Sequence, residues 1–471
     1  MKQLSSDKDT SDSGEHDRVM KDENSWETLK PLLKRYWSVL PITWLLHLGL
    51  GLPISISGPT LPYLALNTGQ SLGQVSIVYT VRSIIVCVTS IGVGLLLGRL
   101  SSSRSKLLLL LVGSFLGAGY AFLTPIANSP VTLILAQCLF GIGCGTVDTV
   151  NNMLVIFLFG PVLSRSFSHS LHFCVVIGGF LAPVLAQPFL LQMGDISGQT
   201  GSQQTDVCGN AKNVSANSSQ PDVDLAPLKW PYIIVGSLHS IWIIGYAILL
   251  AINFQLVKFQ SVSEKQADEQ AVTVTSPNRM SRRRTAIIVG LFVLFYILHV
   301  GQENMFWSHL YSFGICSRRL KMTPADASLL STIFFVGFLV SRAIGIVISR
   351  LFLPAKILLF QLTGCFIATV LLAILGESSH LAAYICCGMY GFCIAMVFPT
   401  GITWLASKIE VTGSLSSAWF IGAYVGNSTY PLAAGYLIAT SATGPVAMMY
   451  LAAATSAAYL AVVGVMFFIA R

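Results

Sequence analysis

Long apolar stretches recur along the whole chain, each separated from the next by a short polar or charged segment. A helix needs about 20 apolar residues to cross the hydrocarbon core of a bilayer. The 471 residues are 54% hydrophobic and only 10% charged, whereas soluble domains are about 25% charged. Because lipid tolerates only fully hydrogen-bonded backbone, the pattern predicts an all-α polytopic membrane protein. The same composition excludes a soluble enzyme and a disordered chain.

The apolar stretches predict twelve membrane-spanning helices. A long polar segment at 257–284 divides them into two six-helix bundles, at 40–256 and 285–471, and a polar tail at 1–39 is predicted to be disordered and cytosolic. The predicted spans are 40–66, 72–98, 106–127, 131–159, 168–193, 230–256, 285–313, 325–350, 355–376, 380–406, 412–440 and 444–469.

Lysine and arginine residues gather on one side of this arrangement, which the positive-inside rule assigns to the cytosol. We therefore expect both termini to be cytosolic, in a multi-pass protein of the plasma membrane. The net charge of +8 comes mainly from these loops, so it gives no indication of nucleic-acid binding. The bilayer is the expected surrounding, and the chain is expected to be a monomer.

A long polar loop at 194–229 falls on the opposite side. It carries two acceptor triplets for N-glycosylation, which begin at Asn213 and Asn217. Cys208 and Cys316 are both predicted to lie on this outer side, so a disulfide between them and two unpaired thiols are both open.

Charged residues inside the spans are few. Of the 20 Asp and Glu residues, two fall within predicted spans, Asp148 and Glu303, and the same sorting of the basic residues leaves Arg82 and Arg342. An ionised group near the bilayer centre costs about 3 kcal/mol or more, so it faces a partner or a cavity. One hypothesis is a fixed ion pair in each half. The other, which we favour, is a binding group for a cation or a substrate.

The neighbours of Asp148 support the second hypothesis. Asn151 and Asn152 follow at i+3 and i+4 and therefore share its helical face. Carboxylate and amide oxygens are ligands suited to an alkali cation such as Na⁺. We expect Asp148, Asn151 and Asn152 to form a cation-coupling site.

The neighbours of Glu303 suggest a sugar site. Gln302, Glu303 and Asn304 offer hydrogen bonds, and Trp307 offers an aromatic plane for the apolar face of a polyol. Trp307 also fits an interfacial aromatic belt. His47 and His239 are interpreted as packing histidines, and His169 and His172 are not expected to bind a metal, because no carboxylate or cysteine accompanies them.

The two halves have similar sequences where their second spans end. Gly94-Leu-Leu-Leu-Gly98-Arg99 and Gly345-Ile-Val-Ile-Ser349-Arg350 occupy equivalent places. Such a repeat indicates two bundles related by an axis along the membrane normal. The pattern resembles the loop signature of the major facilitator superfamily, and it makes Arg99 and Arg350 candidate gate residues together with Arg82 and Arg342.

Several further motifs resemble one branch of that superfamily, the sodium-dependent glucose transporter-like proteins, which are related to the fucose/proton symporters. The motifs cover roughly residues 40–440. They are Leu48 to Thr60, Arg82-Ser83, Asp148-Thr149 with Asn152, Leu171-His172-Phe173, Gly179 to Pro183, Gly301-x-Glu303 and Phe398-Pro-Thr400. The resemblance adds His172 to the expected sugar-binding residues. One acid common in the family's first span is absent, and that stretch reads Leu-Pro-Tyr63 here.

The resemblance implies alternating-access transport of a hexose such as glucose, coupled to Na⁺, with no other cofactor and no enzyme activity. Proton coupling, uncoupled movement of another polyol or of urea, and a receptor-like protein that does not transport remain alternatives.

Overall fold

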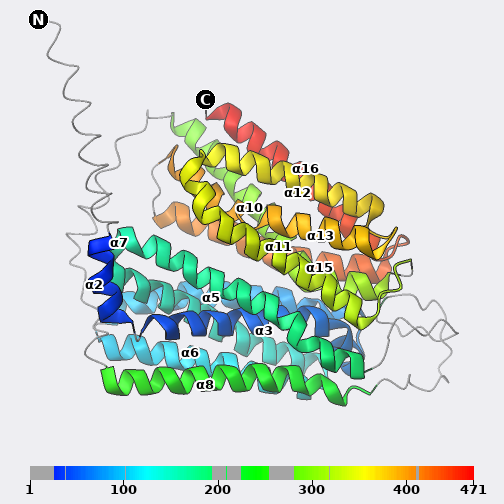
Figure 1. Cartoon of the computed structure of the whole chain (residues 1–471), viewed down its shortest axis with the longest axis horizontal. Coiled ribbons are helices and arrows are strands. Elements are labelled where there is room, and N and C mark those ends of the chain that lie inside the picture. The colour runs from blue at the N-terminus through cyan, green and yellow to red at the C-terminus, as the bar shows by residue number, and fades with distance from the viewer. Residues whose placement is uncertain are drawn as a thin grey trace, which may run out of the picture.

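In the computed structural model of the chain, the described residues are 26–37, 39–100, 102–193, 208, 224–253, 281–317, 319–409 and 413–470. They form helices and short connections, and no strand occurs among them. The helices lie in two bundles, drawn blue to green and light green to red in Figure 1. The predicted all-α class is confirmed.

The first bundle is built from the N-terminal half of the chain. Its helices are α2 (Trp26–Tyr36), α3 (Leu40–Asn67), α4 (Leu72–Val75), α5 (Ile77–Arg99), α6 (Ser103–Leu123), α7 (Pro130–Gln192) and α8 (Lys229–Asn253). Short 3-10 helices precede α7 (Thr124–Ile126) and α8 (Ala226–Leu228).

The second bundle is built from the C-terminal half. Its helices are α10 (Arg282–Cys316), α11 (Pro324–Leu351), α12 (Pro354–Leu375), α13 (His380–Ile394), α14 (Val397–Ala406), α15 (Gly413–Thr440) and α16 (Val446–Ile469). Helices α13 and α14 together make one crossing, at His380–Ala406.

Helix α7 contains two crossings, although it is helical from Pro130 to Gln192. The rings of Phe159 and Phe167 stack with their centroids 3.8 Å apart. Eight residues of straight helix would separate them by about 12 Å. The chain therefore turns back at this point and forms two arms, Pro130–Val155 and Ser170–Gln192, which are the predicted fourth and fifth spans.

Eleven segments of the described chain are long and apolar enough to cross a membrane. Helix α15 (Gly413–Thr440) has 28 residues, which is also sufficient length, but its serine, threonine, asparagine and glycine residues make it more polar. With α15 the crossings number twelve, as the sequence predicts.

The tail predicted to be disordered through residue 39 instead contains helix α2 at its end. Tyr36 is buried, and its ring packs edge-to-face against Phe159 of α7 with centroids 5.8 Å apart. Burial of this ring gives the segment a tertiary contact that its polar composition does not reveal. Residues 1–25 lie outside the described part of the chain, as do most of the predicted loop 194–229 and of the linker 257–284.

Helix α3 lies between the two halves. It packs on α7 in its own bundle and on α10 in the other. A methyl group added at Gly58 would lie 2.6 Å from the main-chain oxygen of Trp307 on α10. The absence of a side chain at Gly58 therefore permits the close approach of the two halves.

The two ends of the bundles differ in how they meet. We call the end that holds α2 and the end of α16 at Ile469 the termini side, and the end that holds Asn67 and Cys316 the disulfide side; they lie left and right in Figure 1.

On the disulfide side and near the middle, hydrogen bonds join the halves. They are Tyr63 Oη to Tyr311 Oη at 3.2 Å, Ser76 Oγ to His309 Nε2 at 3.3 Å, and Thr80 Oγ1 to Ser428 O at 2.6 Å. The halves are thus in contact on the side away from the termini.

Candidate functional site

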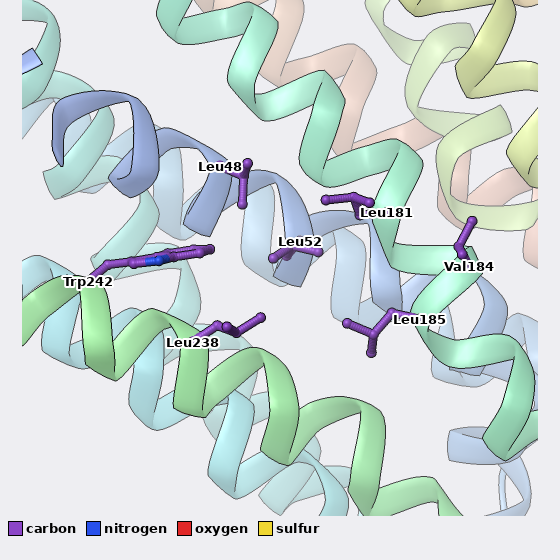
Figure 2. Close-up of a pocket in the computed structure, with 7 residues that line it drawn as sticks. All are labelled: Leu48, Leu52, Leu181, Val184, Leu185, Leu238 and Trp242. Atoms are coloured by element: carbon purple, nitrogen blue, oxygen red, sulfur yellow. The ribbon is translucent and has the colours of Figure 1, made fainter. Parts of the chain in front are cut away.

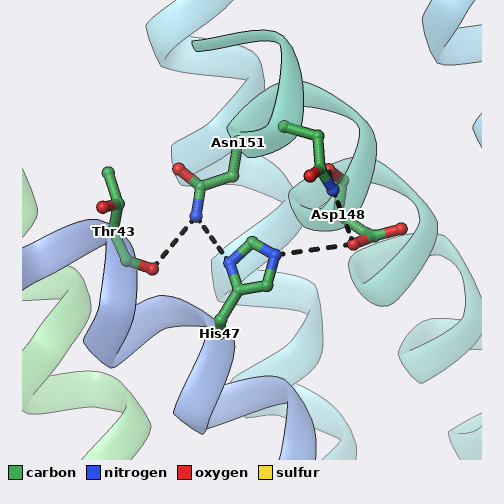
Figure 3. Close-up of polar contacts among 5 residues, drawn as sticks. Thr43, His47, Asp148 and Asn151 are labelled. Atoms are coloured by element: carbon green, nitrogen blue, oxygen red, sulfur yellow. Dashed lines mark hydrogen bonds and ion pairs between the residues drawn. The ribbon is translucent and has the colours of Figure 1, made fainter. Parts of the chain in front are cut away.

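Asp148 lies on the first arm of α7 and faces His47 of α3. The distance from His47 Nε2 to Asp148 Oδ1 is 3.5 Å, and Figure 3 shows the pair with its neighbours. The imidazole is fully buried, whereas 37% of the Asp148 side chain is exposed. The Asp148 carboxylate is therefore contacted by His47 on one side and exposed on another.

Asn151 fixes the orientation of His47. Its Nδ2 donates to the main-chain oxygen of Thr43 at 3.1 Å, and it lies 2.7 Å from His47 Nδ1. Because a main-chain oxygen can only accept, the contact identifies this atom of Asn151 as the nitrogen. His47 Nδ1 therefore accepts, and the imidazole proton is on Nε2, which faces Asp148.

Asn152 also presents a donor to the carboxylate. Its Nδ2 lies 2.9 Å from the main-chain oxygen of Asp148 and 3.0 Å from Oδ1. The predicted trio of Asp148, Asn151 and Asn152 is thus brought together, but in this structure the amide nitrogens, not the amide oxygens, face the contacts described here.

Two more side chains approach Asp148. His172, on the second arm of α7, is exposed, and its ring centroid lies 6.1 Å from that of His47. Tyr424 of α15, in the other half, is close enough to interact electrostatically with Asp148, as is His172. Asp148 therefore faces the region between the halves. Among the described residues, no group of three His, Cys, Asp or Glu side chains could hold a metal ion.

Arg82 of α5 contacts other groups. Its Nη1 donates to Ser57 Oγ at 3.4 Å, and its guanidinium lies over the rings of Tyr79 and Phe140, at 4.9 and 5.8 Å from their centroids. Cation–π contact with two rings compensates part of the cost of burying this charge.

The second half contains a different acid site. Glu303 and His299 are one turn apart on α10, with Nε2 3.6 Å from Oε2, and only 15% of the Glu303 side chain is exposed. Arg342 of α11 interacts electrostatically with Glu303 and lies over the ring of Phe338 at 5.4 Å. Glu303 therefore has a cationic side chain of its own bundle in electrostatic reach.

The residues next to Glu303 divide into two groups. Gln302 is buried and exchanges hydrogen bonds with Ser456 of α16, at 2.9 and 3.3 Å, so it points into its own bundle. Asn304 Nδ2 donates to its own helix, at Val300 O. Trp307 packs edge-to-face on Phe335, with centroids 4.8 Å apart, near the contact of the two halves.

The structure describes the remaining predicted residues only in part. Arg99 is exposed at the end of α5. Arg350 lies in α11, but its side chain is outside the described part, as are Asn213 and Asn217 altogether. Cys208 and Cys316 form a disulfide with Cα atoms 5.6 Å apart, which decides between the two alternatives for this pair and links the loop of one half to α10 of the other.

Sequence reasoning missed His47, which it interpreted as a packing residue. The available signal was a histidine inside the apolar run of the first span, since an imidazole at membrane depth needs a hydrogen-bonding partner. The partner could not be named, because Asn151 is 104 residues away in sequence.

A cavity of about 340 Å³ lies elsewhere in the first bundle, between α3, α7 and α8. Figure 2 shows its lining, which is apolar: Leu48, Leu52, Leu181, Val184, Leu185, Leu238 and Trp242. Apart from the indole of Trp242, such a lining offers no polar side chain to a hydrophilic solute, so we do not assign the transport site to it.

Comparison with known proteins agrees with this architecture. The sequence profile of the Major Facilitator Superfamily matches residues 43–431. The chain belongs to the major facilitator superfamily. It is a multi-pass membrane transporter and not an enzyme, as the resemblance in the sequence implies.

Among curated relatives, the mouse sodium-dependent glucose transporter 1A is 27% identical over 395 residues, covering 83% of this chain and 87% of the relative. The human sodium-dependent glucose transporter 1 is 26% identical over 394 residues, covering 83% and 71%.

Solved structures of this superfamily share the fold. A D-xylose-proton symporter is 14% identical with a TM-score of 0.64, covering 92% of this chain and 97% of its own. The fucose:proton symporter FucP of E. coli is 18% identical with a TM-score of 0.56, covering 92% and 99%.

Proposed function

We propose that this transporter carries a hexose such as glucose by alternating access, and that a co-transported cation neutralises Asp148. One observation carries the proposal: Asp148 is partly exposed between the halves and is held by a histidine and an amide, whereas Glu303 has an arginine beside it. A carboxylate whose described contacts are an imidazole and an amide can be neutralised by an ion from solution before the halves close over it.

Sodium is the first cation to test, because the mouse and human relatives are named sodium-dependent glucose transporters. The proton is the second candidate. Nitrogen donors from His47 and Asn152 face Asp148 Oδ1, whereas Na⁺ prefers oxygen ligands, and two structural neighbours are proton symporters by title.

For the sugar we propose a site between the halves, with Glu303 and Trp307 on α10 and His172 on α7. Trp307 lies where α10 meets α3, and Glu303 keeps some exposure. Gln302 is left out of this set, because both of its described hydrogen bonds are made to Ser456 inside the bundle.

The termini side is proposed to face the cytosol, in the plasma membrane. Basic residues are exposed there at Lys34, Arg35 and Arg99, and the positive-inside rule places such residues in the cytosol. In cells, a glycosidase-sensitive mobility shift should disappear in the double variant Asn213→Gln/Asn217→Gln. A shift that persists in the double variant would contradict the proposed sidedness.

Uptake of radiolabelled D-glucose into proteoliposomes tests the transport proposal. We expect accumulation above the equilibrium level when an inward Na⁺ gradient is imposed, and a proton gradient is imposed in parallel to test the second candidate. L-Glucose serves as the control for leak. Absence of saturable D-glucose uptake under every gradient would refute the hexose proposal and favour another solute or a receptor-like role.

A further inference from the structure

A chain of hydrogen-bonding groups connects α3 with the carboxylate of Asp148. It runs from the main-chain oxygen of Thr43 to Asn151 Nδ2, then to His47 Nδ1, and from His47 Nε2 to Asp148 Oδ1 (Figure 3). Each step has a fixed direction, because the first acceptor is a carbonyl oxygen. The hydrogen of His47 is therefore on Nε2, the atom that faces Asp148.

The contact with Asn151 also fixes which ring nitrogen of His47 faces Asp148. Asn151 is itself held on its other side, because the same Nδ2 donates to the main-chain oxygen of Thr43. The imidazole is fully buried, so water does not offer it an alternative acceptor. His47 Nε2 is thus held toward Asp148.

We infer that His47 is a positioning residue for the coupling carboxylate, and that Asn151 acts through His47 instead of binding the cation. The inference rests on the proposed function, since it assigns these roles within cation-coupled transport. Both described donors, from His47 and Asn152, reach Oδ1. They hold the carboxylate in one orientation, and Oδ2 is left to meet the cation in the space between the halves.

The distance from His47 to Asp148 fits this role. At 3.5 Å, His47 Nε2 lies beyond the usual hydrogen-bond range of about 2.7–3.2 Å from Asp148 Oδ1, so the contact leaves the carboxylate only partly satisfied. Groups that orient an ion's ligand from outside its coordination shell typically contribute about 10–100-fold to metal affinity. We therefore expect His47 to change the cation affinity more than it changes sugar binding.

The test uses substitutions at position 47 that separate loss of the hydrogen-bond donor from loss of side-chain volume. His47→Leu removes the donor and keeps an apolar side chain of moderate size. His47→Gln places an amide nitrogen where it can replace Nε2 as a donor. His239→Leu is the matched control, because His239 is another buried histidine of the same bundle and lies against Gly49 and Gly117.

The readouts are the cation concentration that gives half-maximal stimulation of D-glucose accumulation, the KM for D-glucose, and counterflow exchange, all in proteoliposomes. His47→Leu should raise the half-maximal cation concentration by about tenfold or more, with counterflow and the KM for D-glucose little changed. His47→Gln should restore most of the cation response, and His239→Leu should leave it unchanged.

Asn151 is tested by a double-mutant cycle. If it acts through His47, Asn151→Leu weakens cation stimulation alone but adds nothing in the His47→Leu background. Full additivity would overturn the inference for Asn151 and make it a direct ligand. If His47→Leu is poorly folded, His47→Ala can replace it as the background, because it also removes the imidazole donor.

The results distinguish a failure of the role inferred for His47 from a failure of the proposed cation coupling. If the wild-type protein shows no cation stimulation, the proposed coupling is refuted, and the inference with it. If the wild-type protein is stimulated and His47→Leu responds equally well, or His47→Gln fails as badly as His47→Leu, only the role of His47 is overturned.

Discussion

The two halves of this transporter each contain a buried histidine beside an acid, yet the two pairs differ in what balances the charge. In the first half, His47 and Asp148 meet across two helices, and the carboxylate is 37% exposed. In the second half, His299 and Glu303 are on one helix, the carboxylate is 15% exposed, and Arg342 lies nearby. Glu303 thus has a cationic side chain in electrostatic reach, whereas the described contacts of Asp148 within 3.5 Å are to an imidazole and an amide.

The largest effect is expected when Arg342, the cationic side chain near Glu303 in the second half, is removed. Arg342→Leu would leave Glu303 without its balancing charge, which costs about 3 kcal/mol for a buried pair. Thermal unfolding in detergent should show a large loss of stability. The double variant Arg342→Leu/Glu303→Gln should recover most of it, and a failure to recover would show that the two charges do not compensate each other.

A second change converts the first site into the type found in the second half. His47→Lys places a permanent charge next to Asp148, so an external cation is no longer required. We expect cation-driven accumulation to fall to the level without a gradient, while counterflow of D-glucose continues. Cation dependence equal to that of the wild-type protein would argue against neutralisation of Asp148 as the coupling step.

A third change tests whether Gln302 of α10 packs within its own bundle or binds the sugar. Gln302→Leu removes the buried hydrogen bonds to Ser456, which keeps its contacts with Thr369 and Tyr459, so the loss is about 1 kcal/mol per hydrogen bond. The melting temperature should fall, and the KM for D-glucose should stay close to that of the wild-type protein. A raised KM at unchanged stability would return Gln302 to the sugar site.

The smallest expected effect concerns the contact between the halves. Tyr63→Phe removes the hydrogen bond to Tyr311 and costs about 1 kcal/mol, which corresponds to a shift of about fivefold in the equilibrium between open and closed states. The labelling rate of Ser308→Cys by a maleimide added from the disulfide side should rise by a similar factor. The Ser308→Cys protein with Tyr63 intact is the control, and equal rates would mean that this bond does not hold the halves together.

Much of the fold could be predicted from the sequence, because span length and hydrophobicity are local properties. The twelve crossings and the isolated acids Asp148 and Glu303 follow from counting along the chain. The direction in which a side chain points does not follow from such counting, because it depends on how the helices pack. Gln302 and Glu303 are neighbours, but the packing of α10 against α16 turns one inward and leaves the other partly exposed. The partner of His47 likewise depends on how α3 packs against α7.

The most direct test of the account compares Asp148→Asn with Glu303→Gln in the same vesicles. D-Glucose accumulation under a cation gradient is measured beside counterflow, at matched amounts of folded protein. The account predicts that Asp148→Asn loses accumulation and keeps counterflow, because asparagine imitates the neutral carboxyl, and that Glu303→Gln still accumulates D-glucose. Accumulation that survives in Asp148→Asn, or that disappears in Glu303→Gln while counterflow persists, would contradict it.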